Sequence, residues 1–292
     1  MAEQPKVGTR YRPFMPFAQW PRVPFDQRRW EDMATRLARR RESASAQAWA
    51  GVSHVALRAA TLDAARSADE QTVDLGDTAT QASWRQALSI RGLPGVQALY
   101  EAEVRAHELV GEAAAAGAGL TEELLGRIHE ELIASHEQYP VDYGGRVVLE
   151  DVPAGRFKTF ENYGVMSDGR MRLYAGPDRA PAEVARLTTE TSTDEFGNAH
   201  PVHQSAYVLY AVDAIHPFAD GNGRAARAAA SLPLYGAIGL PLVVTPKSRG
   251  EYLDSLERTE RGDVRPLVAF VYGRGVEAMT QALDVLAASS LS

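Results

Sequence analysis

The chain has 292 residues, of which 45% are hydrophobic and 24% are charged, a composition typical of a globular protein with one large or two small domains. Its formal net charge of −7 argues against general nucleic-acid binding, and the lack of cysteine excludes disulfides and thiolate zinc sites. No apolar run approaches the ~18–20 residues that cross a bilayer, and the first residues lack an apolar signal-peptide core. We therefore expect a cytoplasmic protein with no membrane contact.

The N-terminal part of the chain divides into an arm and a helical region. Residues 1–25 contain five prolines and several aromatic residues, which predict an extended arm lying on the surface. Residues 26–115 predict a helical region, with helices over 27–70 and 96–113 and a polar connection between them. We interpret this region as a candidate regulatory part of the protein.

The residues that follow predict mainly α-helices. Thr121 is a good N-cap, and the residues after it place their apolar side chains on one helical stripe. Further helices are expected over 201–215, 247–258 and 264–287, and the last residues, 276–292, are expected to form a C-terminal helix and tail.

The only clear strand signal of this part of the chain lies in residues 157–174. Ser167, Asp168 and Gly169 form a hairpin turn with mixed apolar residues on both sides. The segment therefore predicts a β-hairpin. The sequence alone leaves open whether this hairpin serves a function or is only a surface feature.

Residues 216–227 read His-Pro-Phe-Ala-Asp-Gly-Asn-Gly-Arg-Ala-Ala-Arg and concentrate the chemistry of the chain. Gly221 and Gly223 let the backbone turn sharply and approach a ligand, and the alanine-rich run behind them is a strong helix former. The loop should therefore lie at a helix N-terminus, where free N–H groups favour phosphate. Arg224 and Arg227 lie three residues apart on the first turn, and guanidinium groups match phosphate oxygens.

Asp220 and His216 add a metal ligand and a base to this phosphate site. A carboxylate beside phosphate is useful when Mg²⁺ bridges the two, and a histidine can take a proton from an attacking hydroxyl. Taken singly, these residues fit a structural histidine, a turn and a solvated helix face. Their joint occurrence at fixed spacing favours transfer of part of a nucleotide to a hydroxyl, and other nucleotide-binding motifs are absent.

At every defined position the segment resembles the signature of the Fic family, His-Pro-Phe-x-(Asp/Glu)-Gly-Asn-Gly-Arg-x-x-Arg. The resemblance covers residues 120–275. It implies a mainly α fold, with a Fic-like helical core and a β-hairpin flap that clamps the modified segment of a target protein. The hairpin over 157–174 falls at the place of the flap, and the N-terminal helical region precedes this core.

The resemblance also implies a role for each matching residue. His216 is the implied general base that deprotonates a Ser, Thr or Tyr of the target, and Asp220 is the implied ligand of Mg²⁺ or Mn²⁺. The remaining implied roles, all in ATP binding, fall to Gly221, Asn222 and Gly223 in the anion hole, Arg224 and Arg227 on the phosphates, and Tyr252 near the adenine.

The chemistry implied by the family is transfer of AMP from ATP to a protein hydroxyl, with release of pyrophosphate. Doc toxins, a related subgroup, carry a lysine in the Gly-Asn-Gly segment and transfer phosphate, so Gly223 favours AMP transfer here. Transfer of phosphocholine or UMP, removal of AMP by the same site, and a non-catalytic nucleotide-sensing module stay open as alternatives.

Fic proteins are commonly restrained by a helix with the pattern (Ser/Thr)-x-x-x-Glu-(Gly/Asn), whose glutamate pairs with the second arginine of the motif. The best candidate here is Glu70, although Arg66 and Gln71 depart from the pattern on either side of it. An exposed acidic helix end, a separate inhibitory partner and the absence of any inhibitor all remain compatible with the sequence.

Overall fold

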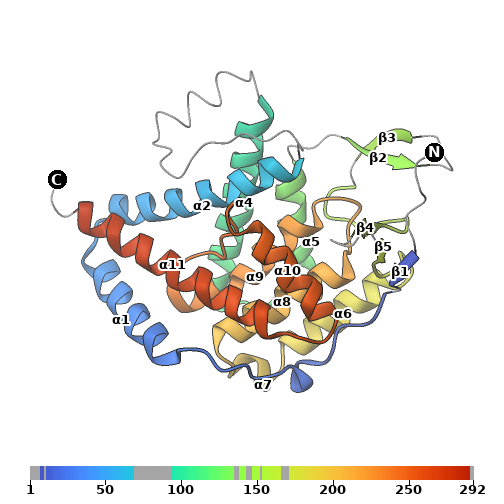
Figure 1. Ribbon diagram of the computed structural model, residues 1–292. Coiled ribbons are helices and arrows are strands. Elements are labelled where there is room, and N and C mark those ends of the chain that lie inside the picture. Colours follow the sequence, from blue (N-terminus) through green and yellow to red (C-terminus); the bar gives the residue numbers. More distant parts are fainter. Residues whose placement is uncertain are drawn as a thin grey trace.

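The computed structural model describes residues 7–9, 11–68, 94–134, 138–142, 147–151, 153–165 and 171–289. It is mainly α-helical, as predicted (Figure 1). The α-helices are α1 (Gln27–Ser43), α2 (Ala46–Ala68), α4 (Pro94–Ala115), α5 (Glu122–Ile133), α6 (Ala180–Thr191), α7 (Asp194–Gly197), α8 (Pro201–Ile215), α9 (Asn222–Ile238), α10 (Arg249–Glu260) and α11 (Arg265–Ser289). The strands are β1 (Val7–Thr9), β2 (Gln138–Asp142), β3 (Val147–Asp151), β4 (Tyr163–Val165) and β5 (Met171–Leu173), and a short 3-10 helix, η1 (Phe17–Gln19), precedes α1.

The helix predicted over residues 27–70 is interrupted. Ala44 is extended, and the side chain of Ser45 accepts the backbone N–H of Ala48 at 3.1 Å. A serine in this position caps a new helix better than it continues an old one, so the chain restarts as α2. The last two residues of the predicted helix, 69 and 70, lie outside the described residues.

The pair α8 and α9 forms the centre of the fold (Figure 1). Nearly every residue of α8 is buried, as expected for a helix that is apolar on all sides. The first half of α9 faces it with fully buried alanines, whose small side chains let the two helices pack closely. The turn between these helices carries the 216–227 segment, so the most buried part of the fold supports it.

The N-terminal arm is extended, as predicted, but it is packed into the core and does not simply lie on the surface. Phe14, Phe17 and Trp20 are each at most 2% exposed, and all three rings meet the ring of Tyr207 on α8 edge to face. Burying a phenylalanine side chain stabilises a fold by about 1.5–3 kcal/mol. These aromatic residues therefore fix the arm to the helical core.

The arm also adds a strand to the predicted hairpin. β4 and β5 pair antiparallel, which confirms a hairpin within 157–174, although its turn lies outside the described residues. β1 pairs with the other edge of β5 in parallel, so the sheet order is β1-β5-β4 (Figure 1). The hairpin thus has one edge already occupied by the chain's own N-terminal segment.

A second hairpin, formed by β2 and β3, was not predicted. Pro140 lies within β2, and a proline inside a short run demotes its strand signal. Helices α6 and α7 were also not predicted. α6 has a proline in its first turn and packs its apolar side against α8.

The C-terminal helices cover the central pair. α10 and α11 correspond to the predicted helices over 247–258 and 264–287. α11 runs without interruption from Arg265 to Ser289, so the predicted division at residue 275 falls inside a helix. None of the helices in the described parts of the chain is long and apolar enough to cross a membrane.

Candidate active site

His216 ends α8 in an unusual backbone conformation. Its φ of 52° makes it the one non-glycine residue with positive φ in the described backbone. Such a conformation costs roughly 1–3 kcal/mol and persists only where the surroundings enforce it. Here its backbone N–H donates to the carbonyl of Val212 at 2.9 Å, and Nδ1 donates to the carbonyl of Asp213 at 2.9 Å.

The imidazole of His216 is held between the helix end and the hairpin. The ring of Tyr174, just after β5, stacks on it with centroids 3.6 Å apart and planes 8° apart. Burial lowers the pKa of His216 to about 4, and although Asp213 opposes this shift, Arg172 and Lys158 add to it. The histidine is therefore neutral at physiological pH. Because Nδ1 donates to a carbonyl, Nε2 is the basic nitrogen.

Backbone hydrogen bonds hold the loop that follows His216. The buried amide of Asn222 accepts from the N–H of Phe218 and donates to its carbonyl, both at 2.8 Å. Asn162, just before β4, donates to the same carbonyl at 3.0 Å. Lys158 donates its backbone N–H to the carbonyl of Pro217 at 2.9 Å. The loop is thus braced both by its own asparagine and by the segment that enters the hairpin.

Gly221 is required at the start of α9. Its φ is +72°, and a Cβ there would lie 2.9 Å from Cδ1 of Ile133. The side chain of Asp220 accepts the N–H of Gly221 at 2.7 Å. Helix α9 begins at Asn222, which confirms that the glycine loop lies at a helix N-terminus.

His129 of α5 contacts the loop that follows His216. Its Nε2 donates to the carbonyl of Asp220, while its Nδ1 accepts the N–H of Gly155, both at 2.9 Å. The ring is fully buried and stacks on Phe218 at 3.8 Å. Burial lowers the pKa of His129 to about 4. Both ring nitrogens are occupied, so His129 shapes the loop and is not available as a base.

The two arginines of the motif are largely buried at the start of α9. Arg224 donates to the carbonyl of Leu132 at 2.9 Å, so part of its guanidinium is bonded to the end of α5. The guanidinium carbon of Arg227 lies 6.0 Å from the ring centre of Tyr252, which is itself 2% exposed and packs on Phe270. Tyr252 thus lies beside the second arginine.

Asp220 differs from its neighbours because its side chain is exposed. One of its oxygens accepts the N–H of Gly221. Within the described residues no three His, Asp or Glu side chains are grouped to hold a metal ion by themselves. A single exposed carboxylate beside a helix N-terminus fits Mg²⁺, which usually takes one or two carboxylates and completes its shell with phosphate oxygens and water.

Part of the chain is similar to a known protein family. Residues 119–234 match the model of the Fic/DOC family. The similarity to this family therefore spans the chain from α5 to most of α9, including the 216–227 segment. Fic adenylyltransferases of Drosophila persimilis and Drosophila mojavensis are 36% and 35% identical to it over 97 residues. These matches cover 33% of this chain and 19% of each relative, so they do not establish the activity of the whole protein.

Solved Fic structures share the fold over most of the chain. A Fic-domain signalling protein of Bacteroides thetaiotaomicron superposes with a TM-score of 0.67 and 17% identity, covering 88% of this chain and 97% of its own. Fic-1 of Caenorhabditis elegans gives a TM-score of 0.62 and 18% identity, covering 89% of this chain and 72% of its own. At these identities the comparison supports the fold alone.

The Fic motif brings His216, the glycine loop and the two arginines into one turn, whereas Glu70 lies outside the described residues. Among the side chains that are described, Glu103 of α4 is a buried carboxylate close to this turn. Burial lowers the pKa of Arg224, and Glu103 acts against that shift. Oε2 of Glu103 also lies 3.8 Å from Nε2 of His107.

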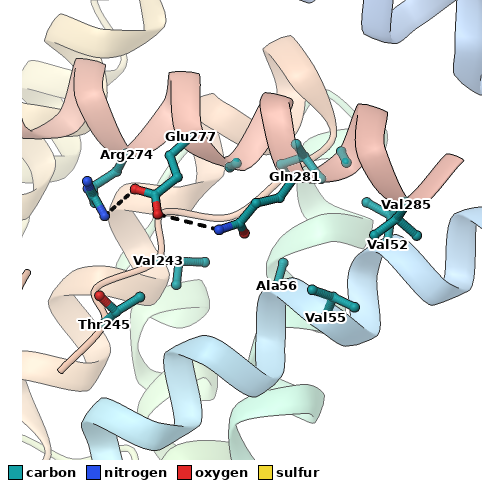
Figure 2. Close-up of a pocket in the computed structure, with 12 residues that line it drawn as sticks. Val52, Val55, Ala56, Val243, Thr245, Arg274, Glu277, Gln281 and Val285 are labelled. Atoms are coloured by element: carbon teal, nitrogen blue, oxygen red, sulfur yellow. Dashed lines mark hydrogen bonds and ion pairs between the residues drawn. The ribbon is translucent and has the colours of Figure 1, made fainter. Parts of the chain in front are cut away.

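Two hollows elsewhere in the protein do not contain the motif histidine or arginines. Figure 2 shows the first, between α2 and α11, where Glu277 pairs with Arg274 and accepts from Gln281 above Val55 and Ala56. Its cavity volume of about 20 Å³ leaves room for about one water molecule and excludes a nucleotide. The second, about 680 Å³, adjoins Phe218, and its charged lining mixes three glutamates with two arginines, Arg127 and Arg156.

The sequence did not reveal the side chains that surround His216. Arg172 and Tyr174 come from the flap hairpin, and Asp213 comes from the last turn of α8. One signal was available, because Asp213 is a charged residue in an almost continuously apolar helix and such a residue is rarely buried unless it is paired. Its partner could not be found from the sequence, since Arg172 lies 41 residues away.

Proposed function

We propose that this protein transfers AMP from ATP to a hydroxyl side chain of a target protein and releases pyrophosphate. The observation that carries the proposal is the neutral His216, with Nε2 as its basic nitrogen, five residues before Gly221, the N-cap of α9. A base and a phosphate-binding loop at this separation suit proton removal and phosphorus transfer in one step. The names of the Drosophila relatives agree with this chemistry.

The proposed reaction is a displacement at the α-phosphorus of ATP. The target hydroxyl oxygen forms a bond to the α-phosphorus while its proton passes to Nε2 of His216. The bond between the α-phosphorus and the oxygen that bridges to the β-phosphate breaks, and pyrophosphate leaves with both electrons. Because burial keeps the pKa of His216 near 4, the imidazole is ready to accept a proton without first losing one.

The phosphates of ATP fit the start of α9. The backbone N–H groups of Asn222 and Gly223 lie at a helix N-terminus, which favours anions. Arg224 and Arg227 supply the local positive charge that a protein of net charge −7 needs for a nucleotide. Bound Mg²⁺ or Mn²⁺ would supply charge neutralisation there, and Asp220 is the residue that would hold it.

The experiment that tests the proposal incubates the protein with a cell lysate and ATP labelled on either the α- or the γ-phosphate. Incubations with His216→Ala give the background, since kinases of the lysate also transfer the γ-label. AMP transfer predicts label above this background with the α-label alone, whereas phosphate transfer predicts it with the γ-label. No label above that background with either, under conditions where the chain binds ATP, would contradict the proposal and favour a nucleotide-sensing module. Parallel incubations with labelled CTP, UTP and CDP-choline test whether the protein transfers another nucleotide or phosphocholine.

Regulation of this site is a separate expectation. If Glu70 pairs with Arg227, it competes with the terminal phosphate of ATP, and each ~1.4 kcal/mol of such competition weakens productive binding tenfold. Glu70→Gly should then raise self-labelling, and Arg227→Ala added to it should remove the gain. An unchanged rate in Glu70→Gly would leave an inhibitory partner or another part of the chain as the restraint.

A further inference from the structure

Arg172 of β5 joins three elements around the end of α8. It is 9% exposed, and its two terminal nitrogens bind different carboxylates, Asp213 at 2.9 Å and Glu260 at 2.6 Å. Asp213 belongs to α8 and Glu260 ends α10. Burial alone would lower the pKa of Arg172, but these two carboxylates outweigh it and raise the pKa, so the guanidinium is charged.

Asp213 links this ion cluster directly to His216. Its side chain binds Arg172, while its backbone carbonyl accepts Nδ1 of His216 at 2.9 Å. A shift of the last turn of α8 would therefore move the carboxylate of Asp213 and the imidazole of His216 together. Because His216 already has positive φ, its ring position depends on such outside contacts.

Tyr174 makes the second link between the hairpin and the imidazole. Residues 172 and 174 alternate to the same side of an extended chain, and the guanidinium carbon of Arg172 lies 5.0 Å from the ring centre of Tyr174. The tyrosine ring in turn stacks on His216 at 3.6 Å. The neighbouring strand leaves space for it, since a Cβ on Gly164 would meet the tyrosine oxygen at 2.5 Å.

We propose that Arg172 is a positioning residue for His216: its bridge between β5, α8 and α10 holds Tyr174 against the imidazole and fixes the last turn of α8. The flap hairpin would then orient the base as well as receive the target. Stability alone gives little reason for three buried charges here, because buried ion clusters are often no more stabilising than apolar residues of the same volume. The kinetic consequence rests on the proposed function, whereas the structural consequence does not.

The structural test uses NMR of the whole chain labelled with ¹³C in its histidine rings. The stacked ring of Tyr174 should displace the ring-proton signal of His216 upfield, and the signal is assigned by its loss in His216→Ala. Tyr174→Leu should remove the displacement, and Arg172→Met should reduce or remove it. Arg22→Met is the matched control, since Arg22 forms an exposed ion pair with Glu195. An unchanged His216 signal in Arg172→Met would overturn the proposal.

A second variant separates positioning from stability. Arg172→Met leaves Asp213 and Glu260 buried without their cation, which can unfold the protein. The triple variant Arg172→Met, Asp213→Asn, Glu260→Gln removes all three charges and should regain thermal stability. It should still lack the wild-type His216 signal. Recovery of that signal together with stability would show that the cluster only holds the fold.

The kinetic test compares kcat with the KM for ATP. Misplacement of a reacting group by about 1 Å can cost about 10²-fold in rate, so the triple variant should lose kcat on that scale while its KM for ATP stays near wild type. A wild-type kcat would overturn the proposal. If the wild type itself transfers nothing, the proposed function fails, and the His216 signal still decides the role of Arg172.

Discussion

The two sides of His216 are built in different ways. The motif side, residues 217–227, is contiguous in the sequence, and Asn222 closes its loop by binding both backbone groups of Phe218, four residues away. The hairpin side is assembled from distant parts of the chain, because Arg172 meets Asp213 and Glu260, and Tyr174 meets His216. The motif side can therefore be recognised in the sequence, while the contacts of the hairpin side form only when the chain folds.

The largest effect is expected from removing His216, the proposed base that lies between the motif side and the hairpin side. His216→Ala should lower transfer by ~10⁴, the upper end for a general base, because the hydroxyl has no other evident proton acceptor. ATP binding should stay nearly unchanged, since the phosphates are expected to lie on the other residues of the motif. Labelling from α-labelled ATP and calorimetric ATP titration measure the two quantities. Equal labelling by wild type and variant would remove His216 from the mechanism.

A smaller loss is expected when the metal ligand on the motif side is removed. Asp220→Ala should reduce transfer by about 10³, because a metal ion contributes several kcal/mol of charge stabilisation. Raising Mg²⁺ or Mn²⁺ should recover part of the rate in Asp220→Ala and none in His216→Ala. Full turnover of the wild type in excess chelator would contradict a metal requirement.

How much the sequence could predict follows from the same comparison. The helical core, the flap hairpin and the His216 to Arg227 segment have local signals, namely apolar periodicity, turn residues and fixed spacing. The partners of Arg172 have none, since ion pairing across 41 residues depends on tertiary contacts. The packing of Phe14, Phe17 and Trp20 on Tyr207 could not be predicted from the sequence either, because aromatic residues in a proline-rich arm do not specify what they pack against.

The hairpin side can be divided further into target docking and positioning of the base. Replacing residues 163–171 by a short Gly-Ser link removes β4 and the start of β5 but retains Arg172 and Tyr174. If a target segment adds to this sheet, loss of about three main-chain hydrogen bonds should raise the KM for the target by about 10². β1 already covers one edge of β5, and β4 is the other edge strand of the described sheet.

The readout for this exchange is target labelling with ATP binding as the control. Undiminished labelling of the target would show that the hairpin does not dock it, even if Arg172 positions His216. A parallel loss of ATP binding would show instead that the exchange disturbs the motif side, so that the two sides are not separable.

Beneath the motif loop an effect is expected on stability and not on transfer. Burial lowers the pKa of His129 to about 4, below the ordinary value of 6.5, and its Nδ1 accepts the N–H of Gly155. Between these two values the unfolded chain binds a proton that the folded protein does not, so stability is present above pH 6.5 and is lost as the pH falls toward 4. His129 alone should account for up to about 3 kcal/mol of this loss.

The measurement is urea unfolding of the wild type and His129→Gln at pH 7 and near pH 4.5. Glutamine can keep one donor and one acceptor but does not titrate, so the variant should lose less stability on acidification than the wild type does. His54→Gln is the matched control, because His54 lies on the surface beside Tyr100 and burial lowers its pKa less strongly. Because His107, His203 and His216 also have pKa values lowered by burial to about 4, some loss should remain in His129→Gln. Parallel pH curves for the wild type and His129→Gln would mean that His129 is protonated in the folded protein, and then it could not accept the N–H of Gly155 under the motif loop.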